Sequence, residues 1–341
     1  METLFDDDLP PVTRGAGSVR PAEVDDGILR LGRLLPASVH LGTSSWSFPG
    51  WQGIVYADAA SESTLARVGL EAYARHPLLR LVGIDRGYYQ PLPRSDYVRY
   101  ANQVPADFRF LVKAPALVTD ATLRGERGAP LEPNPYFLDV ATAIDQFIAP
   151  AIEGLGTRAG PLLFQLPPLP RAQVMGDASH ATIERLGAFF GALPRTIGAV
   201  APLYAVELRN AELLTPRLVR MLRDTGTRLT IGVHARMPAA ARQSAALRAL
   251  DALPAEGDDW RLKGPLVVRW NLHSGFRYDD AKSRYAPFDR IIDPDIATRG
   301  TLAHLVHVAI KSGQPSYIIA NNKAEGCAPL TLVELARAIV T

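Results

Sequence analysis

The sequence has a single cysteine, Cys327, and this scarcity excludes an intrachain disulfide and a cysteine-rich zinc or iron–sulfur site. The first residues, Met-Glu-Thr-Leu-Phe-Asp-Asp-Asp, lack the basic and apolar regions of a secretory signal peptide. No run approaches the roughly 18 apolar residues that a membrane-spanning helix needs. We therefore expect a soluble, cytoplasmic protein with no membrane partner.

Motifs that bind nucleotides or nucleic acids are missing as well. No Gly-x-Gly-x-x-Gly follows the first apolar run, and no Gly-x-x-x-x-Gly-Lys-Ser/Thr occurs in the chain. The 37 Lys and Arg residues are balanced by 35 Asp and Glu residues, so no strong basic excess favours a nucleic-acid partner. Such a partner is not expected.

What the sequence does contain, from residue 39 onward, is a regular alternation of short apolar runs and longer helical segments. Runs such as Leu-Leu-Phe-Gln-Leu are apolar on both faces, as strands are when helices cover them outside and side chains fill the space inside. The predicted strands are 39–43, 81–85, 108–113, 161–166, 204–207, 228–233, 266–270 and 317–320. The predicted helices are 65–75, 95–103, 136–150, 182–192, 214–225, 240–250, 296–312 and 331–340.

Eight strand-then-helix units in one series predict an α/β fold of the TIM (β/α)8 barrel type. The chain has 341 residues, a length at which such a barrel can form one domain, here over residues 37–341. A doubly wound sheet is the alternative architecture. Residues 1–36 are proline-containing and acidic at the start, and they form an N-terminal arm that is flexible or packed on the barrel, with at most a short helix over 26–34.

Two connections are longer than the few residues usual between such elements. They cover residues 119–135, after the third strand, and 271–294, after the seventh. Both leave from the carboxyl ends of strands, where barrel enzymes place their sites, so each is interpreted as a lid or a substrate wall. Simple surface insertions are the alternative.

An apolar run that ends abruptly in charge, Leu203-Tyr-Ala-Val-Glu-Leu-Arg-Asn210, is the strongest local indication of a site. Side chains alternate along a strand, so Glu207 and Arg209 should lie on the same side. A buried carboxylate needs a partner, so the doublet is either a structural ion pair or part of a site.

Polar side chains gather at the ends of the other predicted strands too, and a barrel would bring them to one mouth. Such a mouth has acids for proton transfer, cations for an anionic group and aromatic side chains for an apolar partner. The predicted catalytic residues are Glu207, Lys113 and Asp85. The predicted substrate-binding residues are Trp46, Tyr88, Tyr89, Gln165, Arg209, His234, Arg269, Asn271, Asn321, Asn322 and Lys323.

Several of these candidates also have structural explanations. Trp46, Tyr88 and Tyr89 can cap the barrel, Lys113 can bridge to an acid inside it, and Gln165 can satisfy neighbouring polar groups. Possible metal ligands are scattered and no His-Glu-x-x-His motif joins them, so neither a divalent metal nor another cofactor is expected.

The last predicted strand is followed by Asn321-Asn-Lys-Ala-Glu-Gly-Cys-Ala-Pro329. A glycine and exposed helix amides after the eighth strand of a barrel often hold phosphate, and Lys323 is close in sequence. The alternative is a tight turn in which the two asparagines tie strand ends together. Thr331 and Glu334 have the spacing of a capping box for the final helix.

Seven separated segments, in order between residues 39 and 340, share their pattern with one known family. They are Leu41-Gly-Thr-Ser-Ser-Trp-Ser-Phe-Pro-Gly-Trp51 with Tyr56, Gly83-Ile-Asp-Arg-Gly-Tyr-Tyr89, Phe108-Arg-Phe-Leu-Val-Lys113, Gly160-Pro-Leu-Leu-Phe-Gln-Leu-Pro-Pro168, Ala205-Val-Glu-Leu-Arg209, Val268-Arg269, and Asn321-Asn322 through Pro329. The chain thus resembles the domain-of-unknown-function 72 (YecE-like) family, as a longer branch. The resemblance implies a TIM barrel and no established activity.

Some candidate site residues match the pattern of the family, and others depart from it. Asp85 stands where many members have Asn, and Asp120 and Asn210 stand where a histidine is frequent, so a mechanism that uses histidine at 120 or 210 is not implied. The positions that match the family pattern are Trp46, Tyr89, Lys113, Gln165, Glu207, Arg209, Arg269 and Asn322.

The resulting hypothesis is an enzyme, a hydrolase or an isomerase or lyase, that acts on a small anionic or phosphorylated substrate at the barrel mouth. Glu207 would be the general acid or base, Lys113 and Arg269 would hold the anion, and Tyr89 and Trp46 would form walls. The alternative is a barrel that binds a ligand or partner without turnover.

Overall fold

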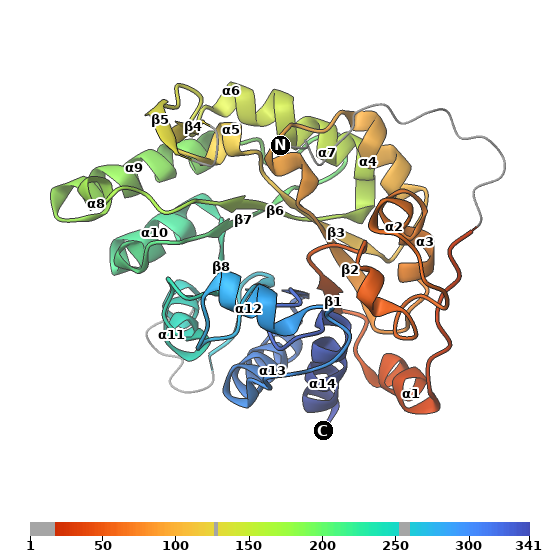
Figure 1. Cartoon of the computed structure of the whole chain (residues 1–341). Helices are drawn as coiled ribbons and strands as arrows, with labels where there is room; N and C mark the ends of the chain where they lie inside the picture. Colours follow the sequence, from red (N-terminus) through yellow and green to blue (C-terminus); the bar gives the residue numbers. More distant parts are fainter. Residues whose placement is uncertain (1–17, 126–128, 252–259) are drawn as a thin grey trace.

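The computed structural model describes residues 18–125, 129–251 and 260–341. Eight parallel strands close into a barrel in the order β1-β10-β9-β8-β7-β6-β3-β2, and helices surround it (Figure 1). The strands are β1 (Val39–Thr43), β2 (Leu79–Ile84), β3 (Arg109–Lys113), β6 (Ala159–Gln165), β7 (Leu203–Glu207), β8 (Arg228–Val233), β9 (Leu266–Trp270) and β10 (Ser316–Ala320). The predicted TIM-type barrel is confirmed, and every predicted strand is present within two residues at each end.

Helices follow the strands along the chain. They are α1 (Asp26–Leu34), α2 (Glu62–Val68), α3 (Leu70–Tyr73), α4 (Arg94–Ala101), α5 (Ala116–Thr119), α6 (Val140–Ala143), α7 (Ala149–Leu155), α8 (Arg171–Val174), α9 (Asp177–Ala192), α10 (Pro216–Thr225), α11 (Ala240–Asp251), α12 (Tyr278–Tyr285), α13 (Ile296–Lys311) and α14 (Ala328–Val340). Short 3₁₀ turns lie at Pro49–Trp51, Arg86–Tyr88, Gly156–Arg158 and Ala211–Leu213.

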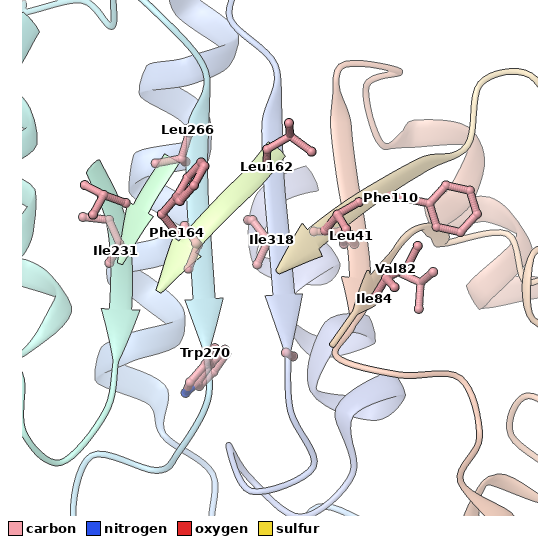
Figure 2. Close-up of a cluster of buried hydrophobic side chains, with 14 of the residues drawn as sticks. Leu41, Val82, Ile84, Phe110, Leu162, Phe164, Ile231, Leu266, Trp270 and Ile318 are labelled. Atoms are coloured by element: carbon pink, nitrogen blue, oxygen red, sulfur yellow. The ribbon is translucent and has the colours of Figure 1, made fainter. Parts of the chain in front are cut away.

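The strands are apolar on both faces because each face packs into a different hydrophobic core. Phe110, Leu162 and Phe164 belong to the large core between the barrel and its helices (Figure 2). A smaller core fills the inside of the barrel, and its members are Leu81, Leu111, Leu163, Ala205, Val267, Tyr317 and Ile319. Burial of such side chains contributes about 25 cal/mol per Å² of apolar surface, which makes both faces stabilising.

The barrel closes where the first strand meets the last. β1 pairs with β10 in parallel over its whole length, from Val39 opposite Ser316 to Thr43 opposite Ala320. The next strand pairs differ in extent, and β7 and β8 are joined only at Ala205 with Arg228 and Val206 with Leu229. Closure brings the carboxyl ends of all eight strands to one end of the barrel.

The part of the N-terminal arm that the structure describes lies on the barrel. The backbone N–H of Ala22 donates to the carbonyl oxygen of Val55 (2.9 Å), and that of Ala57 donates to Arg20 (2.9 Å). The predicted short helix is present as α1, capped by the Asp25 side chain, and it packs against α14. Residues 1–17 of the predicted arm lie outside the described residues.

Two helix predictions need correction. The helix predicted to end at Pro150 continues to Leu155, because a π-helical turn over Ile144–Ile148 leads into α7 and places Pro150 in its first turn, where a missing N–H costs little. The capping box predicted at Thr331 is wrong, because α14 already begins at Ala328 with Cys327 as its N-cap residue.

The two long connections contain secondary structure of their own. Residues 119–135 form a small antiparallel sheet of β4 (Thr122–Arg124) and β5 (Pro130–Pro133), and residues 271–294 contain α12. No helix within the described ranges has both the length and the apolar character that crossing a bilayer requires.

Candidate functional site

The inner face of the barrel repeats one pattern on four strands, in which an apolar residue is followed two positions later by a polar one. Because side chains alternate along a strand, the polar members lie one layer nearer the carboxyl ends than the apolar interior core. The four pairs are Leu111 and Lys113 on β3, Leu163 and Gln165 on β6, Ala205 and Glu207 on β7, and Val267 and Arg269 on β9.

Three of these polar side chains, Gln165, Glu207 and Arg269, are hydrogen-bonded to one another or to three neighbours that follow the strand ends, and Lys113 is within the reach of their charges. We call the group the mouth cluster, and its members are Asp85, Lys113, Gln165, Glu207, Arg209, Arg269 and Asn271. All seven were predicted from the sequence as site residues. Hydrogen bonds join six of them, and Lys113 lies close enough for the charges of Asp85 and Glu207 to affect its pKa.

Glu207 is the centre of the mouth cluster and is fully buried. Its Oε1 accepts hydrogen bonds from Nη1 of Arg209 and from Nδ2 of Asn271, the latter at 3.0 Å. Its Oε2 accepts from Nη1 of Arg269 at 2.8 Å. Glu207 and Arg209 therefore do lie on the same side of the chain, as the alternation predicted, but the carboxylate also binds a second arginine.

The charge state of Glu207 follows from these contacts. Burial alone would raise its pKa, but the attraction of Arg209 and Arg269 outweighs burial and lowers the pKa to about 2. The carboxylate is therefore ionised at neutral pH, and its two oxygens are engaged by three donors. This environment is that of an anchor for two guanidinium groups rather than that of a group that exchanges protons during turnover.

Arg269 connects Glu207 to the other side of the mouth. Its Nη1 also donates to Oε1 of Gln165 (2.8 Å), and its Nη2 donates to Oδ2 of Asp85 (3.1 Å). Two polar atoms in this region are buried and have no hydrogen-bond partner in the part of the chain that the structure describes: Nε of Arg269 and Oδ1 of Asp85. Buried polar groups are normally paired, so each of these two unsatisfied atoms calls for an explanation.

Lys113 differs from the other cations of the cluster. Its Nζ lies 3.5 Å from the centroid of the Tyr88 ring, a cation–π contact, and no hydrogen bond or ion pair joins it to another described residue. Burial lowers the pKa of Lys113 from 10.5 to about 8, with Arg269 and Arg209 repelling its charge and Asp85 and Glu207 favouring it. A fraction of this amine is therefore neutral at physiological pH.

His234 and the two tyrosines lie at the edge of the same region. Burial and the charge of Arg209 lower the pKa of His234 to about 4, so the ring is neutral at pH 7, and its Nδ1 accepts from the backbone N–H of Arg236 (3.2 Å). Tyr88 is half-buried under Lys113, whereas Tyr89 is 85% exposed and packs edge-on against Tyr88. These residues can contact a ligand from the solvent side.

Four predicted substrate-binding residues make their contacts within the protein. The indole of Trp46 is buried in the outer core and its Nε1 donates to the carbonyl oxygen of Leu65 (3.0 Å). Asn322 accepts from Nε1 of Trp51 (3.2 Å) and from the N–H of Ala328 (2.8 Å), so it fixes the start of α14.

Asn321 and Lys323 also tie the loop after β10. Nδ2 of Asn321 donates to Oγ of Ser44 (2.8 Å), and its Oδ1 accepts from Nζ of Lys323 (3.2 Å). Lys323 is 7% exposed, so its ammonium is turned into the loop. These contacts match the alternative of a turn that joins strand ends.

Two residues that hold the mouth cluster in place were not predicted. Gly232 on β8 leaves space for the ion pair, because a Cβ there would lie 3.3 Å from Oε1 of Glu207. Gln243 on α11 fixes this glycine by bonding its N–H (3.0 Å) and its carbonyl oxygen (2.8 Å). A glycine inside a predicted strand was the only signal in the sequence.

The titratable groups do not form a metal-binding arrangement within residues 18–125, 129–251 and 260–341. No three His, Cys, Asp or Glu side chains gather there as possible ligands. Cys327 is buried and its pKa is raised to about 12 by burial, so it is not a nucleophile at neutral pH.

Comparison with protein families matches residues 40–341 to the family described as "Protein of unknown function DUF72", and the chain belongs to that family. A DUF72 structure from Enterococcus faecalis is 18% identical with a TM-score of 0.55, covering 89% of this chain and 96% of its own. One from Thermotoga maritima is 20% identical with a TM-score of 0.55, covering 89% and 99%. At these identities the likeness shows the barrel fold. A comparison with curated proteins gives no match.

Proposed function

We propose that this DUF72 barrel is an enzyme that binds a small anionic substrate at the carboxyl ends of its strands and transfers a proton there through Lys113. The observation that carries the proposal is the Lys113 amine, which lies among ionised groups and has no hydrogen bond or ion pair to another described residue.

The sign of the substrate's charge follows from the mouth cluster. Lys113, Arg209 and Arg269 supply three cations, and Glu207 and Asp85 supply two carboxylates, so one positive charge is in excess when Lys113 is protonated. His234 is neutral at pH 7 and does not change this balance. An excess cation in a half-buried setting favours an anionic group, because solvent screens it weakly.

The proton-transfer role falls to Lys113 rather than to Glu207. A general acid or base works best when its pKa lies near the operating pH, and the pKa of Lys113 is about 8 whereas that of Glu207 is about 2. Asp85 is the second group available for proton transfer, since its Oδ1 has no partner among the described residues. Glu207 then acts by positioning Arg209 and Arg269.

The test combines binding with turnover. Small phosphates and carboxylates are screened by thermal shift, and those that stabilise the protein are incubated in deuterated water and followed by NMR for deuterium incorporation or product. We expect at least one anion to bind and to react. Lys113→Met should weaken binding roughly tenfold, which corresponds to about 1.4 kcal/mol, and should abolish the exchange.

The matched control is Lys263→Met, which removes an exposed lysine outside the mouth cluster and should leave both readouts unchanged. Anion binding without exchange or product would favour the alternative of a binding protein. Absence of stabilisation by any anion would contradict the proposed site.

A further inference from the structure

We infer that Lys113 is a covalent catalyst that forms an imine with the carbonyl carbon of an anionic aldehyde or ketone. The inference rests on the proposed function and specifies its substrate class. It starts from the same side chain but from a different property, the nucleophilicity of an amine that forms no ion pair with any acid the structure describes.

The amine of Lys113 is not held by an ion pair to either of the two acids near it. A lysine inside a barrel normally ends in an ion pair, yet Nζ of Lys113 has no ion pair to Asp85 or Glu207, although both acids are close enough to affect its charge. Lysines that attack carbonyl groups are activated by desolvation and by neighbouring cations. Lys113 has both, because it is half-buried and the arginines at 209 and 269 repel its charge.

The ring of Tyr88 can stabilise the protonated imine through the same cation–π contact that it makes with the lysine ammonium. The face of Tyr88 attracts a cation 3.5 Å away, and a protonated imine is a cation at the same place. Burial and the charge of Asp120 raise the pKa of Tyr88 to about 12, so the phenol stays neutral and the ring acts through its face. A hydrogen-bonded acid in this position would instead have to be displaced before the amine could react.

The chemical step balances without an added reagent. The protonated amine first gives one proton to a nearby carboxylate, and the neutral amine then forms the carbon–nitrogen bond. The carbonyl oxygen takes up that proton and a second one from the nitrogen and leaves as water, and the nitrogen keeps its last proton in the imine. A protonated lysine and a carbonyl compound therefore give a protonated imine and water. Oδ1 of Asp85 is a buried acceptor with no partner in the described ranges, and it can carry the protons between nitrogen and oxygen.

The anionic part of the substrate is recognised by the arginine side of the cluster. Among the described residues, Nε of Arg269 is a buried donor with no partner, and Nη2 of Arg209 has one long contact of 3.5 Å, to Gln165. Both guanidinium groups are fixed by Glu207, so they are oriented before a ligand arrives. A carboxylate or phosphate next to the carbonyl group fits this arrangement.

The test is reductive trapping with identified probes. The full-length protein is incubated with pyruvate or dihydroxyacetone phosphate, reduced with sodium borohydride, digested and examined by mass spectrometry. We expect the adduct on the peptide that contains Lys113, and background labelling on the exposed Lys263 and Lys282. Lactate and glycerol 3-phosphate carry the same charged groups without a carbonyl and should give no adduct.

Two variants sharpen the result. Lys113→Arg keeps a cation and should lose the adduct, whereas Tyr88→Leu keeps the amine and should lower trapping about two- to fivefold, the range expected for one cation–π contact. Circular dichroism and thermal unfolding check that both variants are folded. Equal labelling of exposed lysines, or no adduct with either probe, would overturn the imine.

The two proposals fail in distinguishable ways. If anions bind and exchange protons at the mouth while neither carbonyl probe is trapped, the imine is wrong and the proposed function stands. If no anion binds and no lysine is selectively trapped, both are wrong.

Discussion

Two buried arginine–carboxylate sites lie at opposite ends of this barrel, and they are built differently. At the amino-terminal end, Arg228 on β8 forms two bonds of 2.7 Å to the two oxygens of Asp251, and its Nε donates to Pro265 (3.0 Å). At the carboxyl end, Glu207 binds two arginines, and a third cation, Lys113, forms no ion pair with an acid in the described part of the chain.

The two sites differ in their net charge and in whether buried polar atoms remain without hydrogen-bond partners. The Arg228–Asp251 pair is neutral and each of its charged groups is fully engaged, which is how a pair that serves stability should look. The mouth cluster carries one excess positive charge and contains two buried polar atoms without partners among the described residues. In a TIM barrel, the amino-terminal end of the strands is associated with stability and the carboxyl end with chemistry.

The largest expected effect comes from removing each carboxylate. Glu207→Ala and Asp251→Ala should each destabilise the fold by about 3–5 kcal/mol, because each leaves buried guanidinium charge uncompensated. Only Glu207→Ala should also abolish anion binding, since it releases two arginines at the mouth. Urea unfolding and anion binding by calorimetry measure the two effects.

An exposed pair provides the reference for this experiment. Glu71→Ala breaks the surface contact of Glu71 with Arg75 and should cost at most about 1 kcal/mol. If Glu207→Ala costs no more than this, the mouth cluster is not the buried charge site described above. If Asp251→Ala impairs anion binding of the folded protein, the functional contrast between the two ends fails.

A second contrast concerns pH, since the mouth holds a charge that burial disfavours. In the unfolded chain Lys113 should titrate near 10.4, whereas in the folded protein burial lowers its pKa to about 8. Between these values the unfolded chain binds the proton that the folded protein has lost, so this lysine makes wild-type stability rise with pH through that window.

Lys113→Met should therefore be more stable than wild type at pH 7, on the order of 1–3 kcal/mol, and the advantage should fade between pH 8 and about 10.4. Urea unfolding at a series of pH values measures it, with Lys263→Met as the exposed-lysine reference. A constant difference from pH 7 to 10 would show that Lys113 does not carry a buried charge.

Features that depend on residues close together in the sequence could be predicted from it, whereas contacts between residues far apart in the sequence could not. Strands such as 228–233 were predicted because their apolar character reflects two cores, and Glu207 was placed beside Arg209 because side-chain alternation is local. The bond between Arg269 and Asp85 joins residues 184 positions apart and exists only because the barrel closes. The sequence could name both as candidates but not their partners.

The roles within the cluster were harder to predict than its membership. Glu207 was interpreted as a general acid or base because an acid at a strand end often has that role. In the structure it is fully buried and its two oxygens accept three hydrogen bonds, which favours an anchoring role that the sequence alone did not indicate. Trp46 was interpreted as a site wall because the direction of an aromatic side chain in a loop cannot be read from a motif. Its indole turns into the outer core instead.

The smallest expected change in stability comes from replacing the glycine that lies beside each of the two arginine–carboxylate sites. A Cβ on Gly232 would lie 3.3 Å from Oε1 of Glu207, and a Cβ on Gly264 would lie 3.1 Å from Nη1 of Arg228. Both contacts are tight but not prohibitive, and alanine also reduces the entropy of the unfolded chain, so each substitution should change stability by about 1 kcal/mol or less.

The two glycine variants should differ in their affinity for the anion. Gly232→Ala pushes on Glu207, which orients Arg209 and Arg269, so it should weaken anion binding by about three- to tenfold, or roughly 1 kcal/mol. Gly264→Ala pushes on a pair at the opposite end and should leave that affinity unchanged. Calorimetric titration of both folded variants measures it, and equal affinities would mean that small displacements of the Glu207 anchor do not reach the ligand.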